Sequence, residues 1–232
     1  MNEKTIETIT GKAKNFVVIG EAGSGKTEVS LNLAVGLRGL CGRTVHLFDM
    51  DQTKPIFRAR DSIGFVSRGG VVFHYEKQFM DAPIVAAGVI ERLRDPESAV
   101  ILDIGGGAYG SHMIGQFAEF LSGEDTKTIY LINPYRPWSG SRNDIEETIS
   151  RTAGAAHLER ISVGANPNYG TLTTAEDVTR GVEKLREMLP AAEIEFVCAK
   201  RELAGALGEC GLPVLALDLN TTPEWLAQEN QE

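Results

Sequence analysis

The chain has 232 residues and a formal net charge of −9, with 32 acidic against 23 basic side chains. This length suits a single domain that buries its own core. Its 42% hydrophobic and 24% charged residues are ordinary for a globular protein and exclude general disorder. The acidic balance argues against bulk nucleic acid as a partner, because lysines and arginines must neutralise its phosphates.

The cysteines and the apolar segments further narrow the class of protein. Cys41, Cys198 and Cys210 are odd in number and far apart, which argues against a disulfide framework and against a cysteine-based metal site. The N-terminus lacks the apolar stretch of a signal peptide, and the longest apolar run, at residues 82–90, is too short to span a bilayer. We therefore expect a cytoplasmic protein without a membrane role.

Short apolar runs alternate with helical patterns along the chain. A helix is predicted from Thr174, because Thr173 and Glu176 have the spacing of a capping box and apolar residues then repeat at helical intervals. The alternation predicts an α/β fold with a mostly parallel sheet and helices on both faces. The other predicted helices cover residues 26–40 and 83–94. The predicted strands cover residues 15–20, 44–48, 71–75, 99–104, 128–132, 160–165 and 193–199.

A complete phosphate-loop pattern follows the first predicted strand. The segment GEAGSGKT fits G-x-x-x-x-G-K-[ST] and precedes a predicted helix, as such a loop requires. Lys26 should reach the β- and γ-phosphates of a nucleoside triphosphate, and the Thr27 hydroxyl should ligate Mg²⁺. The predicted nucleotide-binding residues in this part of the chain are Gly20, Glu21, Ala22, Gly23, Ser24, Gly25, Lys26, Thr27 and Glu28.

A second metal partner is predicted at the end of another strand. Asp103 closes the apolar segment AVILD, and Gly105, Gly106 and Gly107 follow it in a loop that could pass close to the γ-phosphate. An isolated aspartate after a strand is more often a turn or cap residue. Together with the phosphate loop, a Walker B role for Asp103 is the better interpretation.

These patterns predict one P-loop NTPase domain over residues 15–220. Residues 1–14 form an extension that we expect to be either a first strand or disordered. Residues 221–232 form an acidic tail without a basic residue, unlike the basic amphipathic segments that dock on membranes.

With Asp49 and Asp51 after the second predicted strand, the chain resembles the MinD/ParA-like branch of SIMIBI-class P-loop ATPases, also described as the CobQ/CobB/MinD/ParA nucleotide-binding domain. The resemblance covers nearly the whole chain. It implies that Asp49 and Asp51 belong to switch I, which helps to hold Mg²⁺ and to position the attacking water. Lys26, Asp49 and Asp51 are then the expected catalytic residues, and Thr27, Asp103 and Asp49 the expected metal ligands. It also places Asn166 where the family contacts the base.

Later segments follow the family in order. Asn133 and Pro134 match a strand-and-turn motif, residues 196–203 match the last strand and the loop beside the base, and residues 211–214 match a G-x-P-V turn.

Two departures from the family affect the expected activity. Glu21 stands where the family usually has a lysine that reaches the nucleotide of a partner subunit, and Gly105 replaces a proline. Guanine-specific relatives carry N-K-x-D, whereas here Tyr169 stands at the aspartate position after Asn166. Adenine is therefore favoured, and the expected cofactors are ATP and Mg²⁺.

Two other groups of residues leave alternatives open. Lys54, Arg58 and Arg60 could substitute for the missing lysine, although a solvated charged surface is the simpler interpretation. Arg136 and Trp138 lie in a proline-rich loop after a strand, where they could serve the site or form a rigid turn.

The favoured function is a slow ATPase that acts as a nucleotide-dependent switch or maturation factor with an unidentified protein partner. We expect a monomer or a weak nucleotide-dependent homodimer. The main alternative is an ATP-sensing module with negligible hydrolysis. A small-molecule kinase or a metallochaperone-type GTPase ranks lower, because no acceptor site and no guanine signature are evident.

Overall fold

One parallel sheet of eight strands forms the centre of the structure, a computed structural model that describes residues 3–51, 64–74, 88–190 and 192–221. The strand order is β3-β2-β4-β1-β5-β6-β7-β8, and each neighbouring pair is parallel. The strands are β1 (Asn15–Ile19), β2 (Thr44–Asp49), β3 (Val72–His74), β4 (Ser98–Asp103), β5 (Thr126–Ile132), β6 (Ile161–Ala165), β7 (Ile194–Lys200) and β8 (Val214–Leu217).

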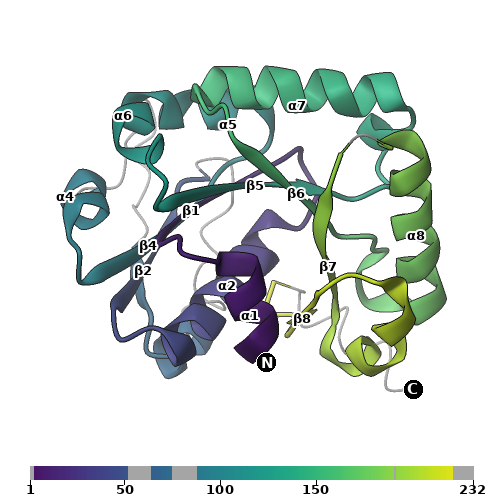
Figure 1. The fold of residues 1–232 in the computed structure, drawn as a ribbon, viewed down its shortest axis with the longest axis horizontal. Helices are drawn as coiled ribbons and strands as arrows, with labels where there is room; N and C mark the ends of the chain where they lie inside the picture. Colours follow the sequence, from purple (N-terminus) through teal and green to yellow (C-terminus); the bar gives the residue numbers. More distant parts are fainter. Residues whose placement is uncertain (1–2, 52–63, 75–87, 191, 222–232) are drawn as a thin grey trace.

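Helices cover both faces of the sheet (Figure 1). One face carries α1 (Glu3–Thr10) and α2 (Lys26–Leu40). The opposite face carries α4 (Val89–Arg94), α5 (Gly107–His112), α6 (Ala118–Leu121), α7 (Arg142–Ala156) and α8 (Ala175–Met188). The chain also forms 3₁₀ segments: η1 (Met113–Phe117), η2 (Pro137–Ser139), η3 (Gly170–Leu172) and η4 (Arg201–Cys210). The predicted α/β fold, with helices on both faces, is confirmed.

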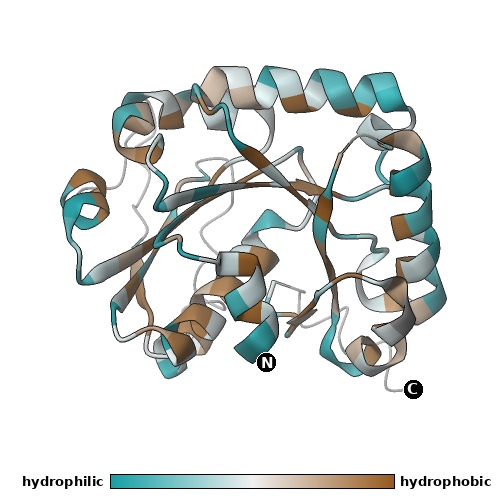
Figure 2. Cartoon of the chain, viewed as in Figure 1, coloured by the Kyte–Doolittle hydropathy of each residue, from teal (hydrophilic) through white to brown (hydrophobic). Residues whose placement is uncertain are grey.

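Successive residues of each central strand point into different cores. In β1, Phe16 and Val18 pack on the side of α1 and α2, whereas Val17 and Ile19 pack on the opposite side. This follows from the two-residue period of a strand. Because both faces are covered, β1 is buried throughout and is apolar from Phe16 to Ile19. Figure 2 shows polar residues gathered on the outer sides of α7 and α8.

Three of the sequence-based elements need correction, and a fourth is described only in part. Residues 3–10 form a helix rather than a strand, with Ile6 and Ile9 buried one helical turn apart. The strand β8 was missed, since residues 211–214 were expected only as a turn, and β7 is therefore not the last strand. The capping box of α8 joins Thr174 and Asp177, one residue later than expected. Of the helix predicted at 83–94, only α4 is described, because residues 75–87 lie outside the described part.

The strand order puts β1 at the centre of the molecule. It lies between β4 and β5. The strands β2, β3 and β4 lie on one side of β1, and the strands β5 to β8 lie on the other side. The carboxyl end of β1 is thus a topological switch point, where α/β sheets of this kind bind their ligands. The segment GEAGSGKT starts at this point. Among the described helices, none is long and apolar enough to cross a membrane.

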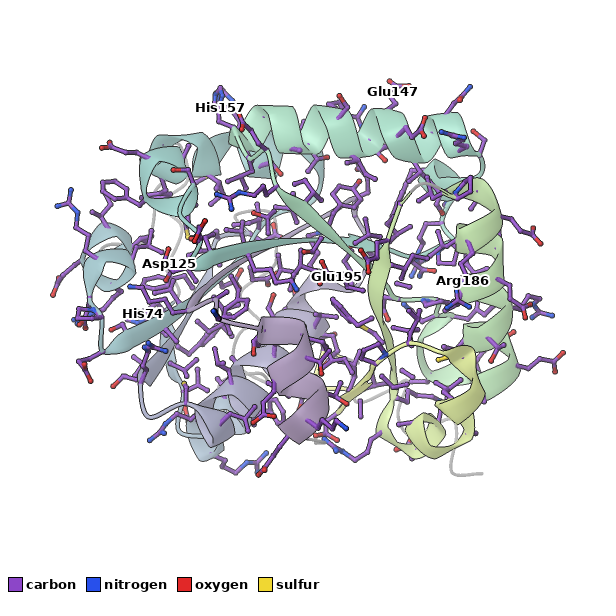
Figure 3. All side chains as sticks on the ribbon, viewed as in Figure 1. His74, Asp125, Glu147, His157, Arg186 and Glu195 are labelled. Atoms are coloured by element: carbon purple, nitrogen blue, oxygen red, sulfur yellow. The ribbon has the colours of Figure 1, made fainter. Side chains whose placement is uncertain are left out.

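Two histidines form a hydrogen-bonded pair at the β2–β3 edge of the sheet. His46 is buried, and its Nδ1 lies 2.9 Å from Nε2 of His74, whose ring stacks on Phe48 at 4.1 Å (Figure 3). Burial, followed by the charges of His74 and Arg92, lowers the pKa of His46 to about 4. A bond between two ring nitrogens needs one donor and one acceptor, so at least one ring is neutral.

This pair should make stability depend on pH. His46 has a pKa near 6.5 when unfolded and about 4 when folded, so between these values the unfolded chain binds more protons and stability falls as pH falls. From pH 7.5 to pH 5 we expect a loss of about 2 kcal/mol from this group, measured as the free energy of unfolding in urea. The loss should shrink by about that amount in His46→Gln. The loss should persist in His112→Gln, which changes an exposed histidine. An equal loss of stability in the wild type and in both variants would show that His46 is not its source.

Candidate nucleotide-binding site

The segment between β1 and α2 folds as a tight loop that only glycine permits at two points. Gly20 has a φ of 145°, and a Cβ placed there would lie 2.6 Å from the carbonyl oxygen of Leu131 in β5. Gly25 has a φ of 92°, and its Cβ would lie 2.2 Å from Nδ2 of Asn166 after β6. The loop therefore packs directly against the ends of two strands, and its glycines serve both backbone conformation and close approach.

Lys26 is the first residue of α2, and its side chain folds back over the loop. Its Nζ donates to the carbonyl oxygen of Glu21 at 3.0 Å, and the backbone N–H of Ser24 donates to the same oxygen at 3.3 Å. The ammonium group thus lies across the mouth of the loop, only 7% of Lys26 being exposed. An oxygen acceptor in this position, such as a phosphate oxygen, would be within its reach.

Three aspartates lie at the carboxyl ends of two adjacent strands. Asp49 in β2 is the register partner of Asp103 in β4, and Oδ1 of Asp49 accepts the backbone N–H of Asp51 at 3.1 Å. Asp103 is 2% exposed and accepts a hydrogen bond at 3.4 Å from Ser30 in α2. Ser30 lies three residues after Thr27, so the Thr27 hydroxyl is on the helix face that turns toward β4.

These residues fit Mg²⁺ only together with a nucleotide. In the described part of the chain, no three His, Cys, Asp or Glu side chains lie close enough together to hold a metal ion by themselves. Magnesium at phosphate loops keeps several waters and takes one or two protein ligands besides phosphate oxygens. The Thr27 hydroxyl and a carboxylate of Asp103 or Asp49 match that donor set. A Mg²⁺ ion held by these residues would therefore need phosphate oxygens among its ligands.

The glycine-rich loop after β4 packs on the phosphate loop. The backbone N–H of Gly107 donates to the Gly20 carbonyl at 3.2 Å, and a Cβ on Gly106 would lie 3.0 Å from the backbone nitrogen of Ala22. Asp51 also lies close to this loop, since a Cβ on Gly105 would come 3.2 Å from its Oδ1. The same loop is thus in contact with the phosphate loop and with Asp51.

Glu21 turns its carboxylate away from the loop interior. Its Oε1 accepts a hydrogen bond at 2.7 Å from Arg151 of α7, and its side chain is only 14% exposed. The carboxylate raises the pKa of the Arg151 guanidinium above its usual value. The expected repulsion between Glu21 and a nucleotide is thereby reduced, because the charge is compensated within the same chain.

Glu28 is bonded to the C-terminal segment rather than directed at the phosphate loop. Its two carboxylate oxygens accept hydrogen bonds from the backbone N–H groups of Asn220 at 2.7 Å and Thr221 at 2.9 Å, and from the Thr221 hydroxyl at 2.6 Å. In the described structure its carboxylate thus anchors a segment far along the chain, and its predicted role as a nucleotide contact stays a prediction.

A pocket of about 130 Å³ lies beside the phosphate loop, at the carboxyl ends of β6, β7 and β8. Gly25, Asn166, Lys200 and Thr221 are among its lining residues. Asn166 is 4% exposed, and its Nδ2 donates to the Ser24 carbonyl at 2.8 Å. The amide group of Asn166 thus joins the phosphate loop to this pocket.

The described residues that line this pocket offer no available carboxylate for the recognition of guanine. Tyr169, at the position of the guanine-binding aspartate, is half exposed and stacks on Tyr135 with ring centroids 4.3 Å apart. Among the described residues that line the pocket, the only carboxylate belongs to Glu28, which Asn220 and Thr221 occupy.

Arg136 and Trp138, left open by the sequence, both contact the phosphate loop. Nε of Arg136 donates to the Gly23 carbonyl, and Nε1 of Trp138 donates to the Ala22 carbonyl, each at 3.1 Å. Sequence reasoning missed Ser30 and Arg151 altogether. For Ser30, the only available signal was its position three residues after Thr27, on the same helix face. The cations Lys54, Arg58 and Arg60 lie outside the described residues.

The anchoring of the C-terminal segment can be tested with Glu28→Gln. Glutamine offers one oxygen instead of two and turns donors toward the donors of Thr221, so we expect about 1–3 kcal/mol less stability. Urea unfolding measures this loss, and limited proteolysis should cut near Asp218 more readily. Glu147→Gln is the matched control, since Glu147 is exposed on α7 and points outward (Figure 3). Unchanged stability and cleavage in Glu28→Gln would remove the anchoring role.

Comparison with known proteins supports the fold. No protein-family model and no curated protein sequence matches the chain. The structure of FtsY from Thermotoga maritima superposes with a TM-score of 0.55 at 15% identity, over 87% of this chain and 70% of that one. FtsY from Elizabethkingia anophelis in complex with GDP superposes with a TM-score of 0.50 at 16% identity, over 84% and 59%. A nucleotide-binding protein from Archaeoglobus fulgidus in complex with ADP gives a TM-score of 0.49 at 17% identity, over 97% and 96%. At this level of identity the similarity concerns the fold alone: the chain has the α/β fold of the FtsY structures.

Proposed function

We propose that this chain is a Mg–ATP-binding P-loop protein of the MinD/ParA-like branch, which hydrolyses ATP slowly and acts as a nucleotide-dependent switch or maturation factor. The observation that carries the proposal is the alignment of three features at one sheet edge. The phosphate loop lies at the switch point, with Asp49 and Asp103 at the ends of β2 and β4 on one side and the pocket of β6–β8 on the other. Metal, phosphates and base would then be bound in a line.

Each part of Mg–ATP has a proposed set of contacts. Residues 20–27 cradle the phosphates through backbone N–H groups, and Lys26 neutralises their charge. Thr27 and Asp103, with help from Asp49, hold Mg²⁺. The base enters the pocket beside Asn166, whose Nδ2 is bonded to Ser24 and whose Oδ1 remains the oxygen acceptor for an adenine amino group. The lack of an available carboxylate among the described lining residues supports adenine over guanine.

The proposed switch uses the loops on either side of Gly105. Asp51 positions the attacking water, and residues 105–107 connect it to the phosphate loop through Gly107 and Gly106. A γ-phosphate would contact both segments, so its loss on hydrolysis would release them. An unidentified protein partner would read this difference.

Glu21 argues against a tight sandwich dimer driven by ATP. The side chain at the position of the trans-acting lysine is acidic, and it is paired with Arg151 of its own chain. It has no positive charge to offer to the nucleotide of a second subunit. We therefore propose a monomer, or a weak nucleotide-dependent homodimer.

The same observation favours one alternative, an ATP-sensing module with negligible hydrolysis. If the missing lysine is required for turnover, Mg–ATP would bind and order the loops without being consumed. The phosphate and base contacts would be the same in both cases, so only turnover distinguishes them.

Nucleotide choice can be measured by thermal unfolding. Mg–ATP at about 100 times its Kd should raise the melting temperature by about 5–10 °C, and Mg–GTP at the same concentration should raise it by several degrees less. The GTP arm is needed because one structure of similar fold holds GDP.

Lys26→Ala should fold but lose most of both shifts, while Lys12→Ala, an exposed lysine before β1, should keep them. A larger shift with GTP would overturn the adenine assignment, and full shifts in Lys26→Ala would overturn the phosphate-loop assignment.

Hydrolysis can be tested with Asp51→Asn under single-turnover conditions. If Asp51 positions the water, the variant should bind Mg–ATP with unchanged affinity and cleave it roughly 100-fold more slowly. Asp125→Asn changes an aspartate at the amino edge of the sheet, just before β5 (Figure 3), and should cleave at the wild-type rate. Binding without any cleavage in the wild type would favour the sensing module, and normal cleavage in Asp51→Asn would exclude Asp51 from catalysis.

A further inference from the structure

Three consecutive peptide groups of the phosphate loop are held from outside by side-chain donors. Nε1 of Trp138 donates to the carbonyl of Ala22 at 3.1 Å, and Nε of Arg136 donates to the carbonyl of Gly23 at 3.1 Å. Nδ2 of Asn166 donates to the next carbonyl, that of Ser24, at 2.8 Å. The donors come from two different loops, one after β5 and one after β6.

The orientation of these carbonyls determines the orientation of the N–H groups behind them. The loop's peptide bonds are trans, so each carbonyl points opposite to the N–H of the following residue. Holding the carbonyls of residues 22, 23 and 24 outward therefore turns the N–H groups of Gly23, Ser24 and Gly25 inward. The Ser24 N–H already points across the loop, toward the Glu21 carbonyl at 3.3 Å. Successive inward N–H groups of this kind form an anion-binding nest.

The two loops that carry the donors are themselves tied together. Asn133 at the end of β5 is fully buried, and its Nδ2 donates to the Asn168 carbonyl in the loop after β6 at 3.0 Å. Pro134 and Pro167, which follow the two strands, both pack on Gly181 of α8, where a Cβ would come within 3.1 Å and 2.4 Å of them. The two loops that carry the donors are thus joined to each other and packed on α8.

The loop after β5 is also fixed internally. The Ser139 hydroxyl lies 2.7 Å from the carbonyl oxygens of both Asn133 and Arg136 and can donate its one hydrogen to either. The Asn133 side chain accepts the backbone N–H of Tyr135 at 3.1 Å. A donor held in this way does not need to reorganise when a ligand arrives, which is the condition for effective electrostatic preorganisation.

We infer that Arg136 and Trp138 are positioning residues for phosphate binding, which act through the backbone of the phosphate loop. The inference rests on the proposed function and deepens it. Arg136 contributes through the hydrogen bond of its Nε to Gly23, and its positive charge is secondary. Trp138 contributes its indole N–H. Asn166 completes the set and links it to the pocket beside the loop.

The test uses variants that remove one donor while keeping size or charge. Trp138→Phe keeps an aromatic ring in the core contact and removes the N–H, and Arg136→Lys keeps the charge and removes the planar Nε–H. Tyr135→Phe is the matched control, since its hydroxyl lies in the same loop but donates to the Asp177 carbonyl of α8. The ligands for calorimetry are Mg–ATP and magnesium pyrophosphate, the latter reporting on phosphate contacts without a base.

We expect Trp138→Phe and Arg136→Lys each to weaken both ligands about 3- to 10-fold, the effect of one hydrogen bond, and Tyr135→Phe to leave both affinities unchanged. Because pyrophosphate has no base, an equal loss for both ligands localises the effect to the phosphate loop. Wild-type affinity for pyrophosphate in Trp138→Phe and Arg136→Lys would overturn the inference. Retained affinity in Arg136→Lys, with a loss in Arg136→Gln, would overturn it for Arg136 and show that the charge acts.

A ligand-free measurement separates this inference from the proposed function. In NMR spectra without nucleotide, Trp138→Phe should increase the mobility of the amides of Gly23, Ser24 and Gly25, with Tyr135→Phe as reference. If the wild type binds neither ligand, the proposed function fails, and this readout alone decides the inference: unchanged amide mobility would overturn it and increased mobility would support it.

Discussion

The phosphate loop must keep its carbonyl oxygens outside and its N–H groups inside, and much of the surrounding structure serves this requirement. A loop that follows a buried strand has no secondary-structure partner for these groups, so each carbonyl needs another donor. Arg136, Trp138 and Asn166 supply three of them from the ends of β5 and β6. The close approach of Asn166 explains why glycine is required at residue 25, and the approach of the Leu131 backbone explains it at residue 20.

The helix α7 contacts the phosphate loop through an ion pair between Arg151 and Glu21. Arg151 holds the carboxylate of Glu21, so a residue that would oppose a triphosphate is compensated within its own chain. Arg151 is about half exposed, and an isolated pair of this kind contributes little to stability. Its consequence is local. It fixes where the negative charge of Glu21 lies, and so the charge that the loop presents to a nucleotide or to a second subunit.

The C-terminal segment completes the site from the opposite side. The side-chain amide of Asn32 in α2 makes two hydrogen bonds with the backbone of Asp218. Its Oδ1 accepts the Asp218 N–H at 2.8 Å, and its Nδ2 donates to the Asp218 carbonyl at 2.9 Å. Arg201 pairs with the Asp218 carboxylate, and Glu28 holds Asn220 and Thr221. Residues 218–221 thus bind along the first turns of the helix that follows the phosphate loop, and Thr221 lines the adjacent pocket. Anything that moves the first turn of α2 would move this segment too.

By itself, the sequence determined the local features: the seven predicted strands, the helix after β1 and the glycine-rich loop between them, because apolar periodicity and the G-x-x-x-x-G-K-T spacing act over a few residues. It did not give β8, which is only four residues long, or the helix at 3–10, whose apolar signal is two isoleucines. Only the tertiary structure decided where the charged side chains of the loop point. Glu21 meets Arg151 across 130 residues of sequence, Glu28 meets Thr221 across 193, and Ala22 meets Trp138 across 116. Such contacts depend on the order of strands in the sheet, which brings the ends of β1, β5, β6 and β8 to one edge, and no local pattern in the chain encodes that order.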